Sequence, residues 1–205
     1  FPGICIAAGF LVSRIKLKFF HAGLAVSAAI LTVLAISTFL RAQVWQSEIS
    51  LWVDSVKKAP HNARAWNNYG NALAKKGHKN KAMLAYQEAI KLSPGSANPY
   101  CNLGKIHAQN KALDTAERLF LKSIDLDPGF AEAHNNLAIV YMSKGQREKG
   151  IAHFKQALNL DNQRPMTHFN LGKAYLDSGD SQNAIKHLSQ AISMKKAVGN
   201  SMGLI

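Results

Sequence analysis

The chain places an asparagine at four positions that are 34 residues apart: Asn68, Asn102, Asn136 and Asn170. A carboxamide both donates and accepts hydrogen bonds, so it can pair with the N–H and with the carbonyl of a peptide group. A column of such side chains would hold an extended peptide by its backbone, with little dependence on the peptide's sequence. The alternative is that the same amides join neighbouring structural units to one another.

Further polar and basic side chains share the predicted helix faces with this column. They are Arg64, Asn67, Asn71, Asn98, Lys105, Asn135 and Lys173. Glu132 is the only acid in the set of residues grouped with this column, so we predict a polar, mildly basic groove that binds a protein or peptide ligand.

Two histidine positions also recur at this interval, His134 with His168 and His153 with His187. Equivalent positions on adjacent helical hairpins lie about 10 Å apart, whereas zinc needs each ligand nitrogen within about 2.1 Å. We therefore expect no metal site. The sequence also lacks a glycine-rich phosphate loop, a supported Ser/His/Asp or Cys/His arrangement and a carboxylate pair in a plausible pocket, so we predict no catalytic residue and no cofactor.

The elements that must position these residues repeat with the same period. Proline recurs at Pro60, Pro94 and Pro128, and Asn162 is next in phase. Position one of each repeat is then Ala63, Ala97, Ala131 or Pro165. Large residues occupy positions four, eleven and twenty-four, and Gly or Ala occupies positions eight and twenty. Position four is Trp66, Tyr100, His134 and His168. Position eight is Gly70, Gly104, Ala138 and Gly172. Position twenty-four is Tyr86, Phe120, Phe154 and Leu188.

This pattern resembles the tetratricopeptide repeat. The resemblance implies an all-α fold, a solenoid of helical hairpins, with repeats at 61–94, 95–128, 129–162 and 163–196 and a tail at 197–205. The small residues let the two helices of a hairpin approach closely, and the aromatic residues fill the space between hairpins. We expect positive φ at Gly77, Gly145 and Gly179, where each first helix ends, and Lys111 departs from glycine there. The asparagine column is similar to the asparagine ladder of O-linked N-acetylglucosamine transferases.

The beginning of the chain predicts membrane attachment. Residues 19–40 contain no permanently charged side chain, and a helix of that length, about 33 Å, matches a bilayer core of roughly 30 Å. We predict a transmembrane helix there, preceded at 1–18 by the truncated end of another span and a basic loop. That loop favours an extracytoplasmic location for the repeats, periplasmic or lumenal. Residues 41–60 are predicted to contain a juxtamembrane helix that acts as a half-repeat, with Trp52 as a packing residue.

The junction from Arg41 through Trp45, Glu48, Trp52 and Pro60 to Gly70 resembles one arrangement in particular. It is similar to the boundary between the last span and the repeats in transmembrane-and-tetratricopeptide-repeat O-mannosyltransferases and their bacterial relatives. The resemblance implies the acceptor-binding part of a multi-span glycosyltransferase that uses a lipid-linked sugar. No catalytic residue of that family has a counterpart here, and a membrane-tethered adaptor without chemistry remains the other hypothesis.

The net charge of +13, from 25 basic and 12 acidic residues, is spread along the chain. Dispersed lysines on helical repeats are typical of a solvated surface, so we do not expect a nucleic-acid partner.

Overall fold

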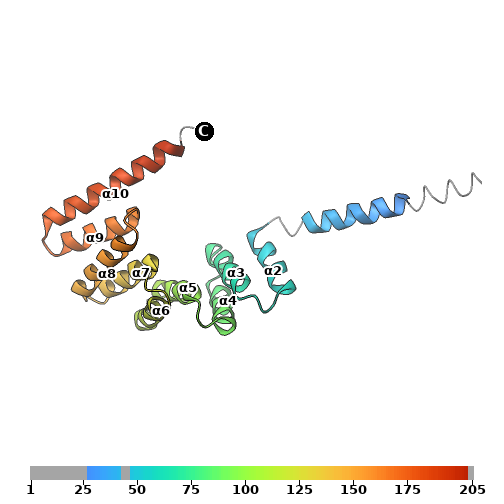
Figure 1. Ribbon diagram of the computed structural model, residues 1–205, viewed down its shortest axis with the longest axis horizontal. Coiled ribbons are helices and arrows are strands. Elements are labelled where there is room, and N and C mark those ends of the chain that lie inside the picture. Colours follow the sequence, from blue (N-terminus) through green and yellow to red (C-terminus); the bar gives the residue numbers. More distant parts are fainter. Residues whose placement is uncertain (1–26, 43–46, 203–205) are drawn as a thin grey trace, which may run out of the picture. The chain divides into compact units, whose positions relative to one another are not determined.

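The computed structural model describes residues 27–42 and 47–202, and every regular element in these residues is a helix (Figure 1). The predicted all-α fold is thus confirmed for this part of the chain. The chain divides into two compact units, Phe1–Asp54 and Ser55–Ile205.

Unit 1 contains a helix over residues 27–42, whose residues are all exposed. Within the residues that the structure describes, no helix combines the length and the apolar character that crossing a membrane requires. The predicted span end and basic loop at 1–18 lie outside the described residues, and so do residues 19–26 of the span predicted at 19–40. The transmembrane helix therefore stays a prediction.

Helix α2 (Glu48–Lys58) lies within the predicted juxtamembrane segment and crosses the boundary between the units. Ser47 caps its first turn, because the Ser47 Oγ accepts a hydrogen bond of 3.0 Å from the Ser50 N–H. Trp52 belongs to unit 1, so its packing on the first hairpin stays a prediction.

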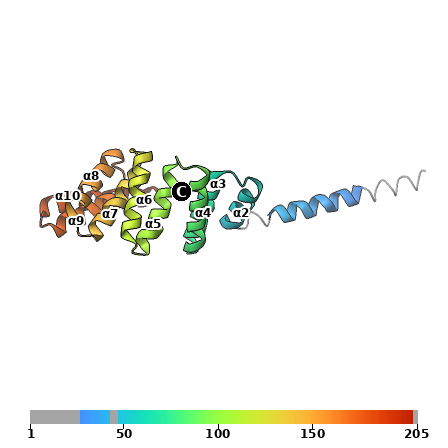
Figure 2. The ribbon, with the colours of Figure 1, turned by 90° about the horizontal axis from the view of Figure 1, so that it is seen from below.

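Unit 2 is a series of four helical hairpins, numbered here in chain order (Figure 2). Each first helix begins at position one of the predicted repeat. The pairs are α3 (Ala63–Lys75) with α4 (Lys79–Leu92), α5 (Ala97–Gln109) with α6 (Leu113–Leu126), α7 (Ala131–Ser143) with α8 (Arg147–Leu160), and α9 (Pro165–Asp177) with α10 (Ser181–Met202). Helix α10 continues past residue 196, where the fourth repeat is predicted to end.

The turn inside each hairpin contains one residue in the left-handed region. Gly77, Gly145 and Gly179 have φ of 80°, 74° and 80°, and Lys111 has φ of 61°. The expectation of positive φ is confirmed, and Lys111 adopts it despite its Cβ.

The two helices of a hairpin approach closely where position eight is glycine. A Cβ built on Gly104 would lie 2.8 Å from Phe120 Cε1, and one on Gly70 would lie 2.5 Å from Tyr86 Cε1. In the third hairpin position eight is Ala138, and glycine stands at position twenty instead: a Cβ on Gly150 would lie 3.2 Å from the Ala138 carbonyl oxygen. In both arrangements one of the two positions, eight or twenty, is glycine. The helices are too close together for alanine at both positions.

Neighbouring hairpins share their cores. One buried cluster joins the second hairpin to the first helix of the third: it consists of Cys101, Ala116, Phe120, Ala133, Leu137, Val140 and Tyr141. A second cluster joins the third hairpin to the fourth: it consists of Ala138, Phe154, Leu158, Leu171, Ala174, Tyr175 and Ala184. The second and the third hairpin therefore each bury an apolar face against the hairpin that follows.

Candidate peptide-binding groove

A cavity of about 950 Å³ lies along the first helices of the first two hairpins, α3 and α5. It collects most of the predicted site residues on one surface, hereafter the polar groove. Those residues are Arg64, Asn67, Asn68, Asn71, Asn98, Asn102 and Lys105.

The polar groove also contains residues that the sequence analysis missed. Lys79 and Tyr86 come from α4, and Ser93 and Ser96 come from the loop that follows it. The predicted groove consists of first-helix positions only, whereas these four residues lie on the second helix or after it. Tyr86 belongs to the column of large residues at position twenty-four, but nothing in the sequence shows that long side chains from α4 reach the groove.

Tyr86 fixes one of the predicted groove residues. Its Oη donates a hydrogen bond of 2.9 Å to Asn71 Oδ1. Burial, followed by the proximity of Cys101, raises the pKa of the Tyr86 hydroxyl to about 12, so this hydroxyl remains a donor at neutral pH. The Asn71 amide therefore has a defined orientation.

The asparagine column joins neighbouring hairpins at two of its positions. Asn102 Nδ2 donates to Asn67 Oδ1 at 3.0 Å, and Asn136 Nδ2 lies 3.7 Å from Cys101 Sγ. The structural role that the sequence left open is thus present at these two positions. The hydrogen bond to Asn67 uses the side-chain N–H of Asn102. The Oδ1 of Asn102 has no partner among the described residues, so a ligand can still bind at that oxygen.

The charge of the polar groove is positive at the first hairpin. Lys105 forms an ion pair of 2.8 Å with Glu132, which reduces its attraction for an acidic ligand. Arg64 and Lys79 also line the cavity, and neither has an ion-pair partner among the described residues. Acidic groups of a ligand are therefore drawn towards the first hairpin.

The other predicted site residues lie outside the polar groove. Asn170 and Lys173 line a separate hollow of about 320 Å³ with the apolar residues Ile139 and Met142. Asn135 is only 8% exposed, and its amide donates to Asn136 Oδ1 at 3.2 Å. The structure thus divides the predicted site, and the hollow at the fourth hairpin is lined by apolar residues as well as by polar ones.

The histidines pair within a hairpin and not between equivalent positions. His134 Nδ1 lies 3.1 Å from His153 Nδ1, and His168 Nδ1 lies 3.0 Å from His187 Nδ1. Among the described residues, no group of three or more His, Cys, Asp and Glu side chains is placed to hold a metal ion. Cys101 is buried, and burial, followed by the nearby Glu132, raises the pKa of its thiol to about 12, so it is not a reactive thiolate.

One hydrogen bond explains the column at position four, which had been assigned only to packing. The side chain of this residue reaches the carbonyl oxygen six residues earlier in every hairpin. The four pairs are Trp66 with Pro60 (2.8 Å), Tyr100 with Pro94 (3.3 Å), His134 with Pro128 (3.2 Å) and His168 with Asn162 (3.0 Å).

This bond also sets the tautomers of the histidines. Because a carbonyl only accepts, Nε2 of His134 must carry the proton, and its Nδ1 is then an acceptor in the neutral ring. His153 Nδ1 must therefore donate to His134 Nδ1, and the same reasoning makes His187 the donor to His168.

Family models match three overlapping segments of the chain. Models described as tetratricopeptide repeat match residues 97–130 and 129–197, and a model described as TPR repeat matches residues 70–111. Together these models cover residues 70–197 with tetratricopeptide repeats. The hairpins of unit 2 are therefore tetratricopeptide repeats, as the sequence pattern predicted.

Several solved structures share this fold. A crystal structure of MamA has 22% sequence identity and a TM-score of 0.63, over 74% of this chain and 89% of that chain. A chain of the APC/C hetero-tetramer Cut9–Hcn1 has 27% identity and a TM-score of 0.67, over 71% of this chain and 29% of that chain. PilF of Pseudomonas aeruginosa has 15% identity and a TM-score of 0.66, over 78% of this chain and 73% of that chain. A comparison with curated protein sequences gave no match.

Proposed function

We propose that this tetratricopeptide repeat protein is a recognition scaffold, which holds an extended and acidic segment of a partner protein in the polar groove. The observation that supports this proposal is the lining of the cavity of about 950 Å³, where amides from two hairpins lie beside Arg64 and Lys79. A cavity of this size holds a short peptide segment.

The amides and the cations have different tasks in this proposal. The Asn102 oxygen accepts a peptide N–H, and the amide of Asn98, which is exposed on the same helix, pairs with a peptide carbonyl. Arg64 binds a carboxylate of the ligand with two parallel hydrogen bonds. Backbone pairing provides affinity that depends little on sequence, and the cations select acidic segments.

The comparisons give this proposal a precedent at the level of fold. Cut9, or its partner Hcn1, is described as part of a hetero-tetramer, so a chain similar to this one occurs in an assembly of proteins. We do not infer that this chain binds the same partner as the chain in that assembly.

A random-peptide display library tests the proposal. Panning on the full chain should enrich acidic peptides, and the affinity of a selected peptide should fall at least about tenfold in Asn102→Ala and Arg64→Ala. Asn159→Ala is the matched control, because Asn159 is exposed and does not line the polar groove, and it should leave the affinity unchanged. Equal binding to all these variants would refute the proposal.

We further propose that residues 19–40 tether the repeats to a membrane and that the repeats lie outside the cytoplasm. The large apolar side chains of the described part of this segment, including Ile30, Leu34 and Phe39, are more than half exposed. Such a surface needs an apolar environment. The chain should remain in the membrane pellet after an alkaline wash, deletion of residues 19–40 should release it, and protease should digest the repeats only from the extracytoplasmic side.

The junction from Arg41 to Gly70 supports a second proposal, in which the repeats present an acceptor protein to the catalytic part of an O-mannosyltransferase-like enzyme. The coding sequence upstream of Phe1 tests it. Several further spans with an acidic first loop would support the proposal, and a start codon immediately before Phe1 would refute it.

A further inference from the structure

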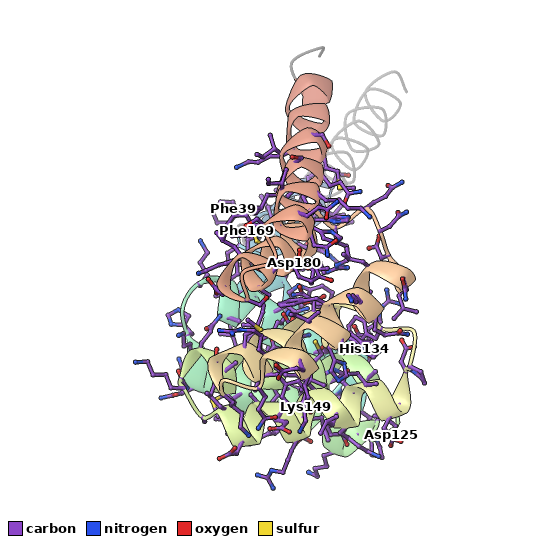
Figure 3. All side chains as sticks on the ribbon, turned by 90° about the vertical axis from the view of Figure 1, so that its left-hand side faces the viewer. Phe39, Asp125, His134, Lys149, Phe169 and Asp180 are labelled. Atoms are coloured by element: carbon purple, nitrogen blue, oxygen red, sulfur yellow. The ribbon has the colours of Figure 1, made fainter. Side chains whose placement is uncertain are left out.

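The face that α9 and α10 present at the end of unit 2, hereafter the end face, is apolar and exposed. Figure 3 views the stack from this end, with Phe169 labelled. Phe169 and Leu176 of α9 are 48% and 57% exposed, and Ile185 and Ile192 of α10 are 66% and 58% exposed. Large apolar side chains gathered on one face indicate an interaction surface.

The same repeat positions are covered in the earlier hairpins. Phe169 stands at position five, where Cys101 and Asn135 are only 1% and 8% exposed. Ile192 stands at position twenty-eight, where Leu158 is 9% exposed. At positions twelve and twenty-one, the first three hairpins have only half-buried residues: Ala74, Ala108, Met142, Met83, Glu117 and Ile151.

The cover in each earlier hairpin is the first helix of the next one. Ala133, Leu137 and Val140 of α7 share a core cluster with Cys101 and Phe120 of the preceding hairpin. These three residues stand at positions three, seven and ten of their repeat. Leu171 and Ala174 of α9, at positions seven and ten, do the same against the third hairpin. The helix that covers such a face therefore presents a small residue, a leucine four residues later and a small or β-branched residue three further on.

A charge on the end face adds to this pattern. Lys105 at position nine pairs with Glu132, which stands at position two of the next hairpin, at 2.8 Å. Lys173 is the position-nine residue of the fourth hairpin, and it is exposed and has no ion-pair partner among the described residues. A covering helix would complete this pair if it carried an acid directly before its small residue.

We propose that the end face binds an amphipathic α-helix of another protein, in the place that the first helix of a following hairpin would take. The helix carries an acidic residue for Lys173, then the small, leucine and β-branched residues in the spacing of Glu132, Ala133, Leu137 and Val140. Its length is about that of α7, which has 13 residues. This mode, with an apolar stripe laid on an apolar surface, continues the interfaces already present within unit 2.

A second copy of this chain fits the end face less well. Helix α10 contains Lys186 and Lys195 and no acidic residue, α9 contains Lys173 and one acid, Asp177, and each copy has a net charge of +13. Two such faces repel one another, whereas a helix that carries an acid is attracted.

A labelled peptide provides the test. The probe is the α7 sequence, Ala131–Ser143, with leucine in place of Asn136. This change is made because Asn136 lies on Cys101, whose equivalent on the end face is the apolar Phe169. Fluorescence anisotropy with the full chain should give saturable binding, and Phe169→Glu and Ile192→Glu should each weaken it at least about tenfold.

The control variants separate this site from other effects. Leu84→Glu changes a side chain that is 66% exposed on the first hairpin, as exposed as Ile185, and should leave binding unchanged. Lys173→Glu should weaken binding, and a peptide in which the acid is replaced by lysine should restore it. Asn102→Ala, which is expected to impair the polar groove, should have no effect here, so failure of one proposal does not imply failure of the other.

Three outcomes would overturn the proposal. The first is the absence of saturable binding, and the second is an equal loss of binding in Leu84→Glu. The third is a dimer of the full chain in sedimentation experiments that Phe169→Glu dissociates, because a second copy would then be the occupant.

Discussion

Lys111 holds a backbone conformation that three glycines hold elsewhere in unit 2, and its φ of 61° places its Cβ close to the following carbonyl group. Lys111→Gly should therefore increase the free energy of unfolding by about 1 kcal/mol. The midpoint of thermal unfolding should rise by about 2–4 °C, as measured by circular dichroism.

The reciprocal variant is the control for Lys111. Gly145 has φ of 74°, and nothing lies within 4 Å of a Cβ built on it, so Gly145→Lys would add strain without a clash. It should destabilise the protein by a similar amount. A stabilising Gly145→Lys would show that positive φ is not the cause.

At the scale of the element, the distance between α5 and α6 depends on Gly104. A methyl group there would lie 2.8 Å from Phe120 Cε1, and Phe120 is itself fully buried. Gly104→Ala should therefore lower the free energy of unfolding in urea by about 1–2 kcal/mol, even though alanine is the better helix former. Gly95→Ala meets nothing within 4 Å and should be neutral or slightly stabilising. Equal effects of the two substitutions would contradict this account.

The histidine pairs make the contacts between helices depend on pH. Burial, and then the neighbouring His134, lowers the pKa of His153, and burial, and then His168, lowers that of His187. Each histidine thus binds protons more readily in the unfolded chain, where its ordinary pKa is 6.5. The free energy of unfolding should therefore be constant above that value and should fall as the pH drops through it.

Urea unfolding at a series of pH values from about 8 to about 5 measures this dependence. Replacing His153 and His187 by glutamine should flatten it, whereas His78→Gln, at an exposed position, should not. A pH dependence that survives the double substitution would rule out the histidine pairs as its cause.

The sequence predicted the helices better than it predicted the site. Helix starts and positive-φ turns follow from local rules, so Ala63, Gly77 and their equivalents could be located from the period alone. The separation of the predicted site residues into two cavities depends on which side chains extend from one helix towards another. Lys79 enters the polar groove from α4, and Asn135 turns inward, and neither orientation is encoded at the position itself.

For the molecule as a whole, the cores shared between hairpins make the stability of unit 2 additive along the chain. Truncation after Asn162 removes α9 and α10 and exposes Phe154 and Leu158 of the second cluster. The remaining hairpins should stay helical, with a lower unfolding midpoint and a smaller denaturant dependence, because less surface is buried. Circular dichroism during urea unfolding measures both quantities, and complete loss of helix would show that the hairpins fold only as one unit.

The hydrogen bond from the side chain at position four to the carbonyl oxygen six residues earlier restricts the length of each loop between hairpins. Tryptophan, tyrosine and histidine make it in turn, so the position requires a donor of suitable reach and not one residue type. One inserted residue between Pro94 and Tyr100 would move the donor away from its acceptor. The turn at Gly145, by contrast, has open space around it. We therefore expect insertions and deletions in related proteins to occur in the turns inside the hairpins. The loops between hairpins should keep their length, and this preserves the 34-residue interval.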